Sequence, residues 1–326
     1  EHLYQLLAHL PSDIEPIVAC PREEPYFSRY SELIGANNVL TVPHRAFRPG
    51  ALFELVRAVR DRNVDLVHSH GKGAGIYSRL LSLLTGTPTV HTFHGLHIGE
   101  YGRHKKALYL LIERFLGWFT ARAICVSDGE RQLIEAARFI TPDKLRTVVN
   151  GVAIPQQHPP IASPPPLQIV SVSRYDHQKY PELVIEIAHQ LRRLQPELAF
   201  VISVLGDGEK RRHCQELIDE ANLGDFVNLA GPTSQPRKAF SSAHVYLSTS
   251  RWEGMPLAVL EAMSEGLPAV ATNVVGNRDV VRDKENGLLF PLDEPETAAA
   301  CLVTMSETSV RAATGHNART MVQEHY

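Results

Sequence analysis

The chain has 326 residues, of which 44% are hydrophobic and 21% are charged, and its formal net charge is −3. This composition is ordinary for a globular protein, and the length predicts two domains, each with a core of its own. Proteins that bind nucleic acids are usually more basic, so we expect no nucleic-acid partner.

The cysteines are widely spaced, and no two of them form a Cys-x-x-Cys pair. They are Cys20, Cys125, Cys214 and Cys301. This pattern predicts reduced thiols in a cytosolic compartment rather than a disulfide framework or a zinc site. No apolar run approaches 18 residues, so we expect no membrane-spanning helix. The sequence opens within a helical pattern and stops without a closing signal, so we expect elements to be missing at both ends.

Strands and helices alternate through residues 14–149, which predicts an α/β domain with a doubly wound parallel sheet. The expected strands are 14–20, 38–42, 64–69, 87–93, 122–126 and 145–149. The expected helices are 27–35, 51–62, 75–84, a long one near 105–120, and 129–137. Ligands of such sheets bind at the carboxyl ends of the strands, where polar residues gather in this sequence.

Two of these strand ends are rich in histidine. Residues 68–75 match neither a P-loop nor a dinucleotide fingerprint, so we interpret them as a tight glycine turn. If this turn binds a ligand, Lys72 and the helix start favour an anionic group. His91, His94 and His97 lie at the end of the next strand, but no carboxylate completes a ligand set at a recognisable spacing, so we expect no metal.

Residues 99–119 combine basic side chains with large apolar ones. The basic residues are Arg103, His104, Lys105, Lys106 and Arg114, and the apolar residues are Leu108, Leu110, Leu111, Phe115 and Trp118. A basic amphipathic helix can lie on an anionic lipid surface. A core helix with a solvated basic end is the alternative, and the sequence leaves both open.

A proline-rich stretch, residues 155–166, predicts a stiff linker, and a second alternating domain follows it. The expected strands are 167–173, 199–205, 227–229, 243–248, 268–271 and 287–290. The expected helices are 181–194, 209–221, 236–241, one that starts at residue 256, and two after residue 290.

The most informative stretch is residues 250–263, which follows one of these strands. Pro256 suits the first turn of a helix, and the free N–H groups there form an anion site, with Gly254 leaving room for a ligand. Glu253 lies in the turn before this helix and Glu261 lies within it. A carboxylate would repel a nearby phosphate, so sugar hydroxyls suit both glutamates better. A capping glutamate and a solvated one are the alternative.

Two motifs resemble those of retaining glycosyltransferases of family 4. One is Glu253 and Glu261, with seven residues between them and Gly-Met-Pro-Leu after the first. The other is Arg174 and Lys179, with four residues between them, after the first strand of the second domain. The resemblance covers nearly the whole chain and implies the GT-B fold, in which two doubly wound, Rossmann-like domains face each other across a cleft. It also implies a nucleotide diphospho-sugar donor, retention of the anomeric configuration, and no metal or other cofactor.

The resemblance implies roles for single residues. Arg174 and Lys179 would compensate the charge of the departing diphosphate, since no metal ion does so. Glu261 would bind the ribose diol, Glu253 the hydroxyls of the transferred sugar, and His94 would touch that sugar. These residues, apart from Glu261, are the catalytic candidates. The donor-binding candidates are Gly206, Asp207, Gly254, Met255, Pro256, Leu257 and Glu261, and the acceptor-side candidates are His70, Lys72, Gly95, Arg103 and Lys105.

The sequence also departs from the family pattern. Tyr180 follows Lys179 where glycine or asparagine is common, and Ala153 stands where aspartate usually follows the Asn-Gly-Val of residues 150–152. We expect the first strand, with its glycine turn near the donor phosphates, and the final crossover helix to be missing. A chain that truly lacks them should be weakly active or inactive.

We therefore expect an acceptor-binding domain at residues 1–154, a linker at 155–166 and a donor-binding domain at 167–326. The expected activity is transfer of a hexosyl or N-acetylhexosaminyl unit, from a UDP-sugar in the first place, to a glycan or polyprenyl-linked acceptor. The resemblance implies synthesis of bacterial envelope polysaccharide or lipopolysaccharide, in the cytoplasm at the inner face of the membrane, with peripheral contact to anionic lipid. The alternatives are a nucleotide-sugar epimerase or hydrolase of the same fold and a non-catalytic nucleotide-sugar-binding protein.

Overall fold

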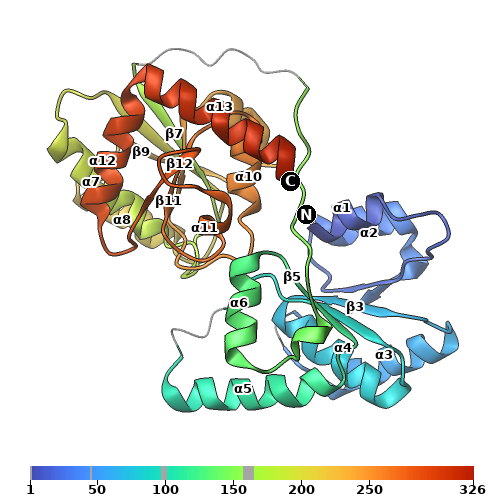
Figure 1. Cartoon of the computed structure of the whole chain (residues 1–326). Coiled ribbons are helices and arrows are strands. Elements are labelled where there is room, and N and C mark those ends of the chain that lie inside the picture. The colour runs from blue at the N-terminus through green and yellow to red at the C-terminus, as the bar shows by residue number, and fades with distance from the viewer. Residues whose placement is uncertain (1, 45, 97–100, 157–164) are drawn as a thin grey trace. The chain divides into compact units, whose positions relative to one another are not determined.

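The computed structural model of the chain describes residues 2–44, 46–96, 101–156 and 165–326 (Figure 1). These residues form two units, one built mainly from residues up to Val148 and one that contains Val149–Tyr326. Residues 157–164 of the predicted linker, and His97 of the histidine-rich segment, lie outside the described residues.

Parallel strands and helices alternate in the N-terminal unit, as predicted. The strands are β1 (Val18–Cys20), β2 (Val39–Thr41), β3 (Val67–His70), β4 (Thr89–Thr92), β5 (Arg122–Cys125) and β6 (Leu145–Thr147). The helices are α1 (His2–Ala8), α2 (Tyr26–Ile34), η1 (Ala36–Asn38), α3 (Pro49–Asp61), α4 (Gly71–Thr85), α5 (Arg103–Trp118), α6 (Asp128–Ala137) and η2 (Pro142–Lys144). The described strands form two pieces of sheet, β1-β2 and β3-β4-β5-β6, and the order of the second piece follows the chain.

Two boundaries of this unit differ from the prediction for physical reasons. β1 begins at Val18 rather than at residue 14, because Pro16 has no N–H to donate to a strand ladder. α4 begins at Gly71 rather than at residue 75, because Gly71 has a φ of +77° and turns β3 directly into the helix. The predicted glycine turn is therefore much shorter than residues 68–75, and Gly73 and Gly75 lie within the helix.

The C-terminal unit contains one continuous parallel sheet. Its strands are β7 (Leu167–Val172), β8 (Phe200–Leu205), β9 (Val227–Gly231), β10 (Val245–Ser248), β11 (Ala269–Thr272) and β12 (Gly287–Phe290). Its helices are α7 (Pro181–Leu194), α8 (Arg211–Glu220), α9 (Pro236–Ser241), α10 (Leu257–Ser264), α11 (Asn277–Val280), α12 (Pro295–Ser306) and α13 (Thr308–His325).

The strand order of this sheet is β12-β11-β10-β7-β8-β9. The chain moves outward from β7 to β9, then returns to the other side of β7 and moves outward again. β7 and β10 are therefore neighbours at the point where the order reverses, and ligands of open α/β sheets bind beyond the carboxyl ends of such strands. This confirms a doubly wound sheet in the C-terminal unit.

The core of the C-terminal unit lies between the sheet and the helices that flank it. α7 packs against α12, and α10 packs against α13 (Figure 1). The strands contribute fully buried aliphatic side chains, among them Leu167, Ile169, Ile202, Leu247 and Val270. Burial of this kind fixes the strand positions and so fixes the loops that follow them. Across the described residues, no helix combines the length and the apolar character that crossing a bilayer requires.

Candidate active site

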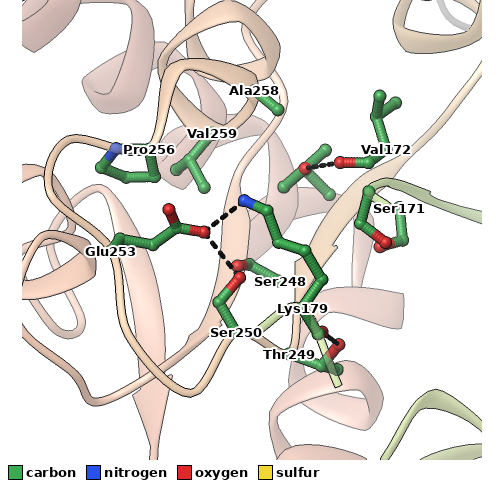
Figure 2. A pocket seen from close by; sticks show the side chains of 12 residues that line it. Ser171, Val172, Lys179, Ser248, Thr249, Ser250, Glu253, Pro256, Ala258 and Val259 are labelled. Atoms are coloured by element: carbon green, nitrogen blue, oxygen red, sulfur yellow. Dashed lines mark hydrogen bonds and ion pairs between the residues drawn. The ribbon is translucent and has the colours of Figure 1, made fainter. Parts of the chain in front are cut away.

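A small pocket lies at the carboxyl ends of β7 and β10, where the strand order reverses (Figure 2). Small hydroxyl side chains at both strand ends line it, together with Lys179, Glu253 and the start of α10. The lining residues are Ser171, Val172, Ser173, Lys179, Tyr246, Ser248, Thr249, Ser250, Glu253, Pro256, Ala258 and Val259. Lys179 and Glu253, which belong to separate motifs of the sequence, thus share one pocket.

An ion pair joins these two residues. Lys179 Nζ lies 2.5 Å from Glu253 Oε1, and Ser250 Oγ donates a hydrogen bond of 2.6 Å to the same oxygen (Figure 2). The side chains of Lys179 and Glu253 are only 19% and 8% exposed. Both bonds use Oε1, so neither of them occupies Oε2 of Glu253. The lysine therefore orients a carboxylate whose second oxygen can accept from a ligand.

The backbone around Glu253 packs tightly against Gly276. A Cβ atom on Gly276 would lie 2.6 Å from Glu253 Cβ, and the φ of Gly276 is +88°. Both the close contact and the positive φ therefore require glycine at this position. Thr272 Oγ1 donates to the carbonyl of Ser250 at 2.6 Å, and Asn277 Nδ2 donates to Thr272 Oγ1 at 3.0 Å. This buried polar chain fixes the turn that carries Ser250 and Glu253.

The backbone of Lys179 is held as firmly as that of Glu253. Asp176 Oδ1 accepts from the Lys179 amide at 3.0 Å, and Thr249 Oγ1 donates to the Lys179 carbonyl at 2.9 Å. The next residue, Tyr180, has a φ of +48°, in the left-handed region that glycine and asparagine adopt most easily. This left-handed conformation explains why glycine or asparagine is common in the family at the position of Tyr180. Arg251 covers the Tyr180 ring, with Cζ 3.6 Å from the ring centroid.

Arg174, the other cation of the predicted pair, lies outside the residues that line the pocket. Its Nε donates to Asp176 Oδ2 at 2.7 Å and its Nη2 to Gln178 Oε1 at 3.0 Å, and its side chain is 58% exposed. Burial pushes the pKa of Asp176 upward, but the hydrogen bonds from Arg174 and from the Lys179 amide hold that pKa below its usual value. Arg174 therefore stabilises the loop after β7 through its bonds to Asp176 and Gln178.

The predicted donor-binding glycine and aspartate, Gly206 and Asp207, follow β8. A Cβ atom on Gly206 would lie less than 2.5 Å from the carbonyl oxygen of Ser173, and the φ of Gly206 is +147°. The carbonyl of Asp207 accepts from the Tyr175 amide at 3.0 Å, while its exposed carboxylate accepts from the Gly208 amide at 2.8 Å. The visible contribution of this turn is to hold the loop that carries Arg174.

The helix start after Glu253 was predicted to be an anion site. α10 begins at Leu257, and Pro256 is its N-cap residue rather than its first helical residue, with a ψ of 87°. Gly254 and Met255 are buried, and Ala258 and Val259 of the first turn line the pocket. The first amides of a helix have no intrahelical partner, so this turn presents donors and a partial positive charge.

Glu261 lies farther along α10, is half-buried, and is not among the residues that line the pocket. The pKa of the buried Tyr246 phenol is raised chiefly by its burial. The nearby charges of Glu253 and Glu261 raise it as well. Neither Tyr246 nor the hydroxyl residues of the pocket, in particular Ser250, were predicted from the sequence. Serines and threonines at the ends of two buried strands are the signal that could have revealed them.

The histidine candidates gather in the N-terminal unit, at the ends of β3 and β4. His70 Nδ1 and His94 Nε2 are 2.9 Å apart. The rings of His2 and His94 meet edge to face, with their centroids 4.8 Å apart. Burial, helped by charge on neighbouring histidines, lowers the pKa of His70 to about 3 and that of His94 to about 4. Both imidazoles are therefore neutral at pH 7.

A metal is the ligand that this histidine group could hold. His2, His70 and His94 each offer one nitrogen, and these atoms lie within 4.8 Å of one another. Neutral imidazole is the form that binds zinc and similar ions. His91, in contrast, is buried and hydrogen-bonded to Ser69 at 2.9 Å, so it does not join the group. The expectation of no metal stays a prediction.

The acceptor-side candidates are not all in one place. Lys72 Nζ donates to the Tyr101 hydroxyl at 2.7 Å, and Lys105 Nζ lies 4.4 Å from the centroid of the same ring, so these two cations share one aromatic partner. Arg103 begins α5 and is exposed. The amide of Gly95, with a φ of +110°, donates to Glu130 Oε1 at 2.5 Å.

The sequence matches two protein-family models. Residues 154–321 match the model described as glycosyl transferases group 1, and residues 1–154 match the one described as glycosyltransferase family 4. The chain belongs to the glycosyl transferases group 1 family. The resemblance stated from the motifs is therefore confirmed.

Similar proteins of other organisms are glycosyltransferases too. The chain is 28% identical over 288 residues to the Escherichia coli UDP-Gal:alpha-D-GlcNAc-diphosphoundecaprenol alpha-1,3-galactosyltransferase, covering 83% of the chain and 74% of that enzyme. It is also 28% identical over 269 residues to one of the polypeptides of the Arabidopsis thaliana phosphatidylinositol N-acetylglucosaminyltransferase, covering 77% of the chain but only 58% of the plant protein.

Solved structures share the fold. Anabaena HepE superposes with a TM-score of 0.81 at 17% identity, covering 100% of the chain and 91% of HepE. Staphylococcus aureus TarM superposes with a TM-score of 0.73 at 22% identity, covering 85% of the chain and 56% of TarM. The prediction of a GT-B fold built from two Rossmann-like domains is confirmed.

Proposed function

We propose that this protein is a retaining, metal-independent glycosyltransferase that moves a sugar from a UDP-sugar to a glycan or lipid-linked acceptor of the bacterial envelope. The observation that carries the proposal is the ion pair of Lys179 and Glu253 inside the pocket at the reversal point of the C-terminal sheet. The name of the Escherichia coli relative, which specifies a UDP-galactose donor and a diphosphoundecaprenol acceptor, supports the choice of donor and acceptor class.

The proposed reaction exchanges one bond at the anomeric carbon of the donor sugar for another. The bond to the diphosphate breaks, a bond to the acceptor oxygen forms on the same face, and the proton of the acceptor hydroxyl passes to the leaving diphosphate. Negative charge grows on the diphosphate as its bond breaks. Fixed cations and amide donors that meet this charge are typically worth about 3–4 kcal/mol each in the transition state.

Lys179 is placed to supply part of this compensation, because its ammonium lies in the pocket beside the first turn of α10. A diphosphate on that turn would meet the amide donors and the ammonium together. Arg174 lies outside the lining of the pocket, and its guanidinium already donates to Asp176 and Gln178. We therefore assign the larger share to Lys179.

The remaining candidates keep the roles that the family implies. We propose that Oε2 of Glu253 accepts from hydroxyls of the transferred sugar, since Oε1 already accepts from Lys179 and Ser250. Glu261 is proposed to bind the ribose, with Gly206 and Asp207 supporting the donor site. His94 is proposed to touch the transferred sugar, and the acceptor-side candidates are proposed to bind the acceptor.

Thermal-shift measurements against a panel of nucleoside diphosphates, with and without EDTA, test the donor assignment. A ligand that binds only the folded state raises the midpoint in proportion to RT ln(1 + [L]/Kd). Selective stabilisation by UDP, unchanged by EDTA, is the expected result. Stabilisation by another diphosphate alone, or only with a divalent ion, would contradict the proposal. Release of free sugar from the donor without any acceptor would instead indicate a hydrolase.

A further inference from the structure

Three histidines from separate segments of the N-terminal unit meet with their rings together. His2 belongs to α1, His70 ends β3, and His94 follows β4. The ring centroid of His2 lies 5.3 Å from that of His70 and 4.8 Å from that of His94, and the centroids of His70 and His94 lie 5.2 Å apart. Because the three segments are distant in the sequence, no local spacing could predict this group.

The hydrogen bonding of the group leaves one nitrogen without a partner. His70 Nδ1 and His94 Nε2 share one hydrogen bond of 2.9 Å, so one ring donates and the other accepts. The ring that donates keeps a lone pair on its other nitrogen, whichever of the two rings it is. His70 Nε2 is buried and has no hydrogen-bond partner among the residues that the structure describes. A buried polar atom of this kind costs free energy until a ligand satisfies it.

The three histidines lie close enough together to bind one ion. One nitrogen of each lies within 4.8 Å of a nitrogen of the other two. Tetrahedral zinc binds histidine nitrogens at about 2.0–2.1 Å, so two ligand nitrogens on one zinc ion are about 3.4 Å apart. Small rotations of the side chains would bring the three nitrogens to that spacing. All three residues keep part of their surface exposed, so the group is not sealed from solvent.

Two of the rings are held in place by their surroundings. His94 has a φ of +60°, in the left-handed region, an unfavourable conformation for a residue with a side chain and one that is found mainly at functional sites. The ring of His68 packs on that of His70, with the centroids 4.2 Å apart, and His68 Nε2 lies 2.9 Å from Thr92 Oγ1. Ligands whose positions are fixed in this way need little rearrangement to bind an ion.

We infer that His2, His70 and His94 form a binding site for one divalent transition-metal ion, Zn²⁺ in the first place. Imidazole suits zinc, copper and nickel, whereas Mg²⁺ and Ca²⁺ prefer oxygen ligands. Three protein ligands leave the fourth position of a tetrahedral ion open for water. If the site binds zinc, the expectation of no metal, which considered the histidines of residues 91–97 by their spacing, is wrong for the N-terminal unit.

This inference is independent of the proposed transfer reaction, in which the diphosphate meets Lys179 of the C-terminal unit. An ion that binds only the folded state stabilises it, so EDTA should lower the thermal midpoint of the zinc-loaded protein. EDTA should not change the further shift that UDP adds. A UDP shift that disappears with EDTA would contradict the proposed metal-independent reaction, and cobalt or zinc titration of the histidine site would still decide the present inference.

Cobalt provides a direct readout of the site. The protein is purified without a histidine tag, stripped with EDTA, freed of the chelator and titrated with Co²⁺. We expect one equivalent to bind and to give the visible absorption of four-coordinate cobalt, because three imidazoles and a water form a tetrahedral set. Zn²⁺ should displace the cobalt and remove the colour, and calorimetric titration with Zn²⁺ measures the affinity.

Variants identify the ligands. His2→Ala, His70→Ala and His94→Ala should each weaken Zn²⁺ binding about 100-fold or more, since the loss even of a residue that only orients a ligand costs about 10–100-fold. The matched controls are His9→Ala and His104→Ala, at exposed histidines of the same unit. Both controls should bind Zn²⁺ as tightly as the unsubstituted protein.

Circular dichroism and the thermal midpoint of the metal-free proteins establish that each variant is folded. The inference fails if Co²⁺ gives no absorption of four-coordinate cobalt, or if the control and ligand variants lose affinity alike. It also fails if His2→Ala, which changes no residue of the sheet, binds Zn²⁺ as tightly as the unsubstituted protein, because His2 would then not be a ligand.

Discussion

Replacing Lys179 with alanine tests the central part of the proposed mechanism. The substitution removes the ammonium that contacts Glu253 and leaves the carboxylate in place with its hydrogen bond from Ser250. If Lys179 binds the diphosphate, the substitution should lower both the affinity for the nucleotide and the turnover rate. If Lys179 only stabilises the fold, the substitution should lower the stability alone.

The two expected effects differ in size. Removing one partner of a fully buried ion pair costs about 3–5 kcal/mol of stability, whereas an exposed pair contributes about 1 kcal/mol or less. Lys179 is 19% exposed and Glu253 retains Ser250 as a donor, so we expect a loss of about 1–3 kcal/mol. The lost compensation of the leaving group should slow turnover about 10²–10³-fold.

A second ion pair in the same unit provides the control. Lys210 Nζ lies 2.5 Å from Glu182 Oε1, and these side chains are 26% and 13% exposed, but neither residue lines the pocket. Lys210→Ala should therefore lose similar stability in urea. Calorimetric titration with UDP should show a loss of roughly tenfold or more in affinity for Lys179→Ala alone, as expected for a charged hydrogen bond.

The result that would refute the reasoning is a matched outcome for the two variants. If Lys179→Ala binds UDP as tightly as Lys210→Ala, and consumes the UDP-sugar at the same rate, the ammonium does not meet the diphosphate. Lys179 would then act as a structural partner of Glu253, and the proposed compensation of the leaving group would lose its principal cation.

Three further predictions follow from the packing. Gly276→Ala should destabilise the protein by about 1–3 kcal/mol and displace Glu253, since the added methyl meets its Cβ at 2.6 Å and φ is positive; urea unfolding and UDP affinity report the two effects. Glu113→Gln should cost about 3–5 kcal/mol in urea unfolding, because it leaves the buried guanidinium of Arg79 without its counter-charge. Stability should also fall as the pH drops from about 6.5 to 4, because the pKa of His70 is about 3 when folded and returns toward 6.5 on unfolding, so the unfolded state binds more protons in that window; thermal midpoints at several pH values measure this.

Controls for these predictions come from the same chain. Gly224→Ala adds a methyl with nothing within 4 Å and should be close to neutral. Glu216→Gln breaks a surface pair with Arg212 and should cost under about 0.5 kcal/mol. His70→Gln should flatten the loss of stability toward acidic pH. Equal losses for Gly276→Ala and Gly224→Ala, or for the two glutamine variants, would contradict the packing argument, and an unchanged pH profile in His70→Gln would contradict the titration argument.

Elements bounded by proline and glycine could be predicted closely from the sequence. Helix 181–194 and strand 287–290 were predicted with the bounds that the structure shows, because Pro181 and Gly287 mark where they start. α4 was predicted less well, since a single left-handed glycine, Gly71, replaced the expected loop. The two pieces of sheet in the N-terminal unit depend on pairing between distant strands, which no local pattern specifies.

The site shows the same division between local and distant information. Lys179 and Glu253 are 74 positions apart, and each was identified from its own motif. Their contact arises because β7 and β10 are neighbours, a property of the whole sheet. Apolar residues on α5 were also visible in the sequence. Whether a neighbour covers them is decided by tertiary packing, and the structure shows Leu108, Leu111 and Trp118 exposed.

The pairing of Lys179 with Glu253 has a consequence for ligand choice. The pocket contains its own counterion, so any phosphate that recruits the ammonium must compete with a carboxylate already in place. If the donor binds in this pocket, as we propose, a diphosphate should compete better than a monophosphate, because it carries more negative charge and more oxygens, and an uncharged nucleoside should not compete. The salt link between Lys179 and Glu253 would then select donors by their charge.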